Sequence, residues 1–245
     1  MALPSGYLPA TRHPWPCLVF ILPLLVGYEV GVQALGGANP ETIRNGADHW
    51  LRYGLSEMGV SLFWVPPAVL VLVFLFWASR RWRDRPDDLT GVLSGMVLES
   101  VAFALGLWGF SRALGPLLLR AGVELRVAAG PGTAVNEQAL RQVVTYLGAG
   151  LYEEAIFRLV LFSGLLLCLR AIDVSRMLAV ALAAVSSAVL FSTAHHIGPY
   201  GQPYSNYLFV FRLVAGLYFA LLYQLRGFGI AVGAHACYNV MVSIS

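Results

Sequence analysis

The stretch EEAIFRLVLFSGLLL, residues 153–167, decides the fold class of this chain. It begins with two carboxylates and an arginine and continues as an apolar run typical of lipid-facing helices. A charge at the centre of a membrane helix costs roughly 2.5–3.5 kcal/mol on insertion scales, so such groups persist where they face a protein interior or a wet cavity. The stretch therefore predicts a membrane helix that carries a functional site.

The composition of the whole chain indicates the same class. Of its 245 residues, 58% are hydrophobic and 12% are charged, whereas about 25% charged residues are usual in soluble proteins. The mean hydropathy is +0.70. We expect an all-α, polytopic membrane helix bundle in a lipid bilayer, with about seven transmembrane helices and a range of six to eight. The net charge of +3 is small, which argues against a nucleic-acid partner.

Seven apolar segments carry the expected spans, at about 16–36, 59–79, 89–111, 137–170, 177–196, 207–225 and 228–245. The fourth segment is longer than one perpendicular span requires, so we expect a surface helix that turns into a membrane helix near residues 148–150. The Pro66–Pro67 pair predicts a kink in the second span. For the first span, a cleaved signal peptide is an alternative.

The two parts of the chain differ in character. Residues 1–135 combine the first three spans with loops, including a polar segment at 37–58 that predicts a loop or an interfacial helix. Residues 136–245 hold the polar motifs. The arginine cluster at 80–85 follows the second span, and the positive-inside rule places it in the cytoplasm. All sixteen basic residues are arginines, which is typical of GC-rich genomes and favours a bacterial inner membrane.

Three pairs of residues with i,i+4 spacing lie in the last four spans: Glu154 with Arg158, Phe191 with His195, and His235 with Asn239. On a helix this spacing puts both members of a pair on one face. Glu153 points about 100° away from its neighbour, so the two carboxylates need not share a task. Acids and histidines on separate membrane helices predict convergence on one cavity.

These side chains suit the attack of water on an amide. A carboxylate in a site of low dielectric constant can act as a general base, and an imidazole can share the water and later donate a proton. A histidine and an asparagine one helical turn apart can donate two hydrogen bonds to an oxyanion. The sequence contains neither a Gly-x-Ser-x-Gly nucleophile elbow nor a His-Glu-x-x-His motif.

In order and spacing, the three motifs resemble the signature of the CAAX-protease and bacteriocin-processing (CPBP) family of intramembrane glutamic endopeptidases. The motifs are Glu153-Glu154-x-x-x-Arg158, Phe191-x-x-x-His195 and His235-x-x-x-Asn239. The resemblance covers about residues 140–242. It implies an intramembrane protease that cleaves a membrane protein or a lipidated, CAAX-like peptide without a metal or any other cofactor.

The resemblance also implies a role for each motif residue. Glu153 would activate the water with the help of His195, while His235 and Asn239 would hold the oxyanion. In a supporting role, Glu154 and Arg158 would brace the site as an ion pair, and Phe191 would form part of its wall. Two departures from the family pattern are His196, a second histidine beside the first, and Leu159, where many relatives carry glycine.

Three other functions fit the same residues. A zinc-dependent membrane hydrolase would use Glu153, His195 and His235 as ligands. A non-enzymatic membrane scaffold could keep the same fold. A proton-coupled transporter could use buried acids as a relay, although no inverted repeat is evident.

The remaining polar and small residues of the spans carry weaker expectations. Glu29, Glu99 and Arg212 are ionisable residues within spans, and we expect the arginine to pair with one of the two acids. The Gly229-x-x-x-Gly233 spacing predicts close helix packing that brings the last span toward the others. The three cysteines have neither disulfide nor zinc spacing.

Overall fold

The computed structural model describes residues 6–120, 137–198 and 201–244. Within these residues the regular secondary structure is entirely helical, which confirms the all-α prediction. The elements are α1 (Tyr7–Thr11), α2 (Pro14–Gly36), η1 (Pro40–Thr42), α3 (Gly46–Glu57), α4 (Val65–Arg80), η2 (Trp82–Asp84), α5 (Leu89–Arg120), α6 (Glu137–Gly148), η3 (Ala149–Glu153), η4 (Ala155–Phe162), α7 (Ser163–Ala171), α8 (Arg176–Ala194), α9 (Asn206–Arg226) and α10 (Phe228–Ile244).

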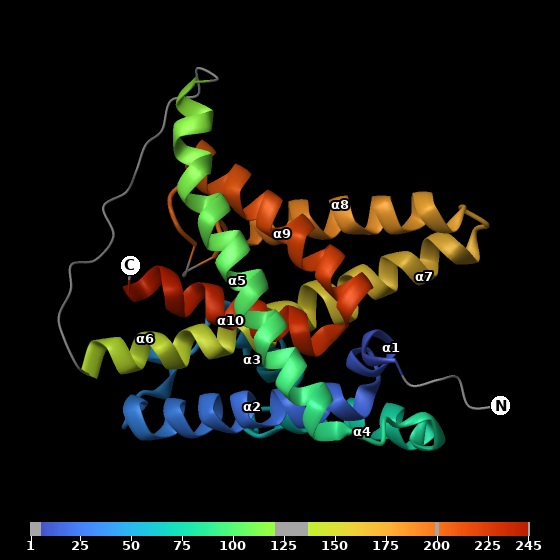
Figure 1. Cartoon of the computed structure of the whole chain (residues 1–245). Coiled ribbons are helices and arrows are strands. Elements are labelled where there is room, and N and C mark those ends of the chain that lie inside the picture. The colour runs from blue at the N-terminus through green and yellow to red at the C-terminus, as the bar shows by residue number, and fades with distance from the viewer. Residues whose placement is uncertain (1–5, 121–136, 199–200, 245) are drawn as a thin grey trace.

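The helices form a polytopic membrane bundle, as predicted. Among the described residues, α2, α5, α8 and α9 are long and apolar enough to cross a bilayer, and α4 and α10 are shorter apolar helices. In Figure 1, α10 and the α6–α7 region lie between the α2–α4 side and the α8–α9 side, and α5 runs across them. The protein is therefore an integral membrane protein with α10 at its centre.

The Pro66–Pro67 pair lies at the start of a helix and does not kink it. Both prolines fall in the first turn of α4, which begins at Val65. The first N–H groups of a helix have no partner within it, so proline costs little there, and its fixed φ angle suits the helix start. The predicted kink is therefore wrong, because the helix begins later than the apolar segment does.

The fourth apolar segment is a continuous run of helix that changes type. Ordinary α-helical turns in α6 give way at Ala149 to wide, π-type turns in η3 and η4, and α-helical turns resume in α7. The change begins within the region 148–150, where the sequence predicts that a surface helix passes into a membrane helix. Wide turns of this kind are rare in proteins, and those that occur often lie at functional sites. Here they enclose the Glu153–Arg158 motif.

Small residues let α10 approach its neighbours closely. A Cβ atom on Gly229 would lie 2.5 Å from Met96 Cε on α5, and one on Gly233 would overlap Ser100 Oγ. This confirms the predicted close packing at these two glycines. On the other side, a Cβ on Gly150 of η3 would lie 2.9 Å from the carbonyl oxygen of Val232. Helix α10 is thus held against η3, beside the first motif.

Candidate active site

Glu153 and Glu154 have different hydrogen-bond partners, as their 100° separation predicts. The Oε1 atom of Glu153 accepts a hydrogen bond of 2.8 Å from Asn45 Nδ2. The Oε1 atom of Glu154 instead lies 2.8 Å from His235 Nδ1 on α10. The first carboxylate therefore faces the segment between α2 and α3, and the second faces α10.

Two imidazole rings converge on the second oxygen of Glu153. The Nε2 atoms of His195 and His235 each lie 3.7 Å from Glu153 Oε2. The Nδ1 atom of His195 lies 2.8 Å from the carbonyl oxygen of Phe191. A carbonyl only accepts, so Nδ1 carries the hydrogen, and Nε2 of the neutral ring is left as an acceptor that faces the carboxylate.

Glu154 and Arg158 form the predicted ion pair. Arg158 Nε lies 3.2 Å from Glu154 Oε2, and both side chains are fully buried. The guanidinium also donates from Nη2 to the carbonyl oxygen of Gly216 on α9 at 3.2 Å. Its carbon lies 4.6 Å from the centre of the Phe191 ring, within the range of a cation–π contact. Removal of one partner of such a pair leaves a buried charge unpaired.

Aromatic rings hold the two histidines in place. Phe191 packs edge-to-face against His195, with 4.8 Å between ring centres, and lies 6.1 Å from His235. Phe219 of α9 stacks on His235 at 4.5 Å with an angle of 15° between the planes. Phe219 belongs to none of the three motifs, and an aromatic residue in an apolar helix carries no signal that would distinguish it.

The predicted catalytic residues line one cavity of about 550 Å³. Glu153, His195, His235 and Asn239 all contribute to its wall, together with the two phenylalanines described above. Its remaining lining is Asn45, Ser111, Arg112, Thr145, Tyr146, Ala149, Tyr207, Leu208, Phe211, Arg212, Ala215, Tyr238 and Val242. The predicted convergence of these side chains on one cavity is therefore present.

The two departures from the family pattern lie outside this arrangement. His196 turns away from Glu153, with its Nδ1 3.0 Å from the carbonyl oxygen of Gln202 and its ring 5.3 Å from that of Tyr204. Leu159 packs against a buried apolar cluster. Of the adjacent histidines, His195 is thus the one placed beside the carboxylate.

The ionisable residues of the first and third spans have partners other than the predicted one. Glu29 binds Arg52 at 2.9 Å, and Glu99 binds Arg226 through two hydrogen bonds of 2.7 and 2.8 Å. The predicted pairing of Arg212 with one of these acids is therefore wrong. The two acids bind arginines of α3 and of the end of α9, whereas Arg212 lines the cavity.

Residues 135–241, which contain all three motifs, match a known family model. Its description is Rce1-like, type II CAAX prenyl endopeptidase. This segment belongs to the Rce1-like family. The match confirms the resemblance seen in the motifs and assigns the Rce1-like segment to the CAAX-type intramembrane proteases. No significant match to the chain was found among curated proteins or among solved structures.

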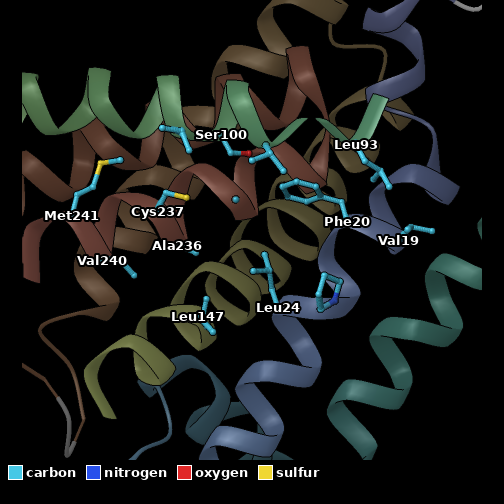
Figure 2. Close-up of a pocket in the computed structure, with 14 residues that line it drawn as sticks. Val19, Phe20, Leu24, Leu93, Ser100, Leu147, Ala236, Cys237, Val240 and Met241 are labelled. Atoms are coloured by element: carbon cyan, nitrogen blue, oxygen red, sulfur yellow. The ribbon is translucent and has the colours of Figure 1, made fainter. Parts of the chain in front are cut away.

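The Rce1-like segment also borders a second cavity, of about 500 Å³, between α2, α5 and α10 (Figure 2). Its wall is almost entirely carbon. Ser100 is the polar exception: its hydroxyl is buried and has no hydrogen-bond partner among the described residues. This cavity brings together no acids or histidines of the described chain.

Proposed function

We propose that this chain is a metal-independent glutamic endopeptidase of the bacterial inner membrane, which cleaves a peptide bond in a membrane protein or a lipidated, CAAX-like peptide. One observation carries the proposal: the Nε2 atoms of His195 and His235 both face Oε2 of Glu153 inside one cavity. A gap of 3.7 Å is longer than a direct hydrogen bond. A water molecule bound to Oε2 and to His195 fits the arrangement.

Glu153 is the proposed general base. It takes a proton from the water, and the oxygen of the water forms a bond to the carbonyl carbon of the scissile amide. The C–N bond then breaks, and the proton passes to the leaving nitrogen from Glu153 or through His195. The second proton of the water also ends on the leaving nitrogen, so the products are a new carboxylate and a new ammonium group, and the reaction needs no co-reactant other than water.

His235 and Asn239 are the proposed donors to the oxyanion. The hydrogen on Nδ1 of His235 is directed to Glu154, so Nε2 can also donate only when the ring is protonated. Asn239 lies one turn further along the same face of α10 and lines the same cavity.

Cleavage by purified protein in detergent tests the proposal. A panel of membrane-tethered and lipidated peptides is incubated with wild type and with Glu153→Gln, each with and without a strong chelator. We expect cleavage that resists the chelator and falls by about 10²- to 10⁴-fold in the variant, as for the loss of a general base. Cleavage that is unchanged in Glu153→Gln would contradict the proposal.

The same experiment also distinguishes the proposed protease from the zinc hydrolase and from the scaffold. No group of three or more potential ligand side chains arranged to hold a metal ion occurs in the described part of the chain. Chelator-sensitive cleavage together with bound zinc would nevertheless establish the zinc hydrolase. A scaffold would cleave no peptide, and its cellular phenotype would survive Glu153→Ala.

A further inference from the structure

Asn45 brings the N-terminal half of the chain into the candidate active site. It lies between η1 and α3, is 6% exposed, and binds Glu153 although 108 positions separate the two residues. It stands outside the segment 135–241 that matches the Rce1-like family. The motifs therefore do not account for the whole environment of the proposed base.

Three further hydrogen bonds hold Asn45 in place, and two of them orient its amide. Its Oδ1 caps α3 and accepts hydrogen bonds from the backbone N–H groups of Ala47 at 2.9 Å and Asp48 at 3.1 Å. Its own backbone N–H donates to the hydroxyl of Tyr28 at 3.2 Å. Since the oxygen of the amide is engaged in the cap, the NH₂ group is the end that faces Glu153.

A buried polar network holds this cap in place. Asp48 is fully buried and accepts hydrogen bonds from Tyr28 at 2.8 Å and from Arg44 and Arg52 at 2.7 Å each. Burial opposes the charge on Arg44, but the hydrogen bond and the charge of Asp48 outweigh it and raise the pKa of the guanidinium above its usual value. Arg44 therefore stays positively charged within this network.

The network also reaches the helix that carries the base. Arg52 donates to Glu29 Oε1 on α2 at 2.9 Å, and Tyr152, the residue before Glu153, donates to the same oxygen at 2.6 Å. Thr145 of α6 donates to the carbonyl oxygen of Ile43 at 2.9 Å. The same set of hydrogen bonds therefore holds both the cap residue Asn45 and the helix that carries Glu153.

We propose that Asn45 is a positioning residue for Glu153. Its N–H group holds Oε1 of Glu153, which leaves Oε2 to face both imidazoles. The catalytic consequence rests on the function proposed above. The inference adds that residues 37–57, although outside the family match, belong to the working active site.

Asn45→Ser tests this role because it separates the cap from the contact. Serine also caps helices well, but it has no amide to reach the carboxylate. We expect kcat to fall by about 10- to 100-fold with KM within about twofold of wild type, as for the loss of a hydrogen bond to a charged group. Asn45→Asp keeps both the cap and the shape but places a second carboxylate against Glu153, so its kcat should be lower still.

A matched control is Asp88→Ser at the start of α5, where Asp88 accepts a hydrogen bond of 2.8 Å from the N–H of Gly91. It also exchanges a capping side chain for serine, far from the cavity, and should leave kcat unchanged. A kcat for Asn45→Ser within twofold of wild type would overturn the positioning role. The proposed function would survive that result if Glu153→Gln is inactive.

A measurement without substrate checks the contact itself. Thermal unfolding in detergent is followed for Asn45→Ser, Glu153→Ala and the double variant. Residues joined by a hydrogen bond show non-additive effects, so the double variant should lose less in unfolding midpoint than the sum of the two singles. Additive losses would overturn the contact. If the losses are coupled but the wild-type protein cleaves no peptide, the contact stands and the proposed function fails. The positioning role then fails with it.

Discussion

The two faces of α10 border two cavities of similar volume and opposite chemistry. His235 and Asn239 face the cavity of about 550 Å³, together with Glu153. Ala236 and Val240, each one position further along, face the apolar cavity of about 500 Å³. Volume therefore does not distinguish the candidate site from its neighbour. The chemistry of the lining side chains does distinguish them, because the helical period places polar residues on one face of α10 and apolar residues on the other.

The largest expected effect on the polar cavity comes from removing one partner of the buried ion pair between Glu154 and Arg158. Arg158→Leu leaves Glu154 without its cation in a fully buried position, and such losses cost about 3–5 kcal/mol. We expect a large fall in unfolding midpoint in detergent and loss of cleavage. The double variant Arg158→Leu with Glu154→Leu is the control. It removes both charges, so it should recover much of the stability but none of the activity.

The adjacent residues His195 and His196 allow a histidine of the polar cavity to be compared with its neighbour. We expect His195→Ala to lower kcat by about 10²- to 10⁴-fold, because its Nε2 is placed to share the attacking water. His196→Ala should retain activity, since that ring faces Gln202 and Tyr204. Peptide cleavage under saturating substrate measures both. Equal losses in the two variants would mean that the geometry at Glu153 does not select the histidine.

Neighbouring positions on α10 compare its two faces directly. Asn239→Ala should lower kcat by about 10²- to 10³-fold, the effect expected for one oxyanion donor. Val240→Ala enlarges the apolar cavity and should lower stability while kcat of the folded protein stays near wild type. Cleavage and thermal unfolding are measured on both. A loss of kcat in Val240→Ala as large as that in Asn239→Ala would show that the faces are not independent.

The smallest effect is expected from a substitution of Ser100, the polar residue in the wall of the apolar cavity. Ser100→Ala removes a buried hydroxyl that has no hydrogen-bond partner among the described residues, so its loss leaves nothing unsatisfied. We expect an unfolding midpoint equal to or slightly above that of wild type, and unchanged cleavage. A clear drop in either would assign the apolar cavity a polar function that its lining does not indicate.

The motif residues could be placed from the sequence because each pair lies within one helix. The i,i+4 spacing puts Glu154 beside Arg158 and His235 beside Asn239 whatever surrounds the helices. Convergence of the three helices followed from the cost of charge in lipid, which drives such groups toward a shared interior. The bundle class followed from composition for the same reason.

The contacts that were not predicted depend on tertiary packing. Asn45 is recognisable as a helix cap, but a cap is a local feature, and its partner lies 108 positions away. The partners of Arg212 depend on helix rotations that hydropathy does not define. The Pro66–Pro67 pair was assigned to a kink because an apolar run does not show where its helix begins.

Three consecutive residues, Tyr152, Glu153 and Glu154, each bind a different part of the bundle: Glu29 of α2, Asn45 before α3 and His235 of α10. Their order along the helix sets which partner each one meets. Inserting or deleting a single residue just before them would rotate all three about the helix axis and move each away from its present partner. The length of residues 149–162 is thus constrained as strictly as the identity of the motif. A mutant library built on this region should vary side chains and keep the residue count fixed.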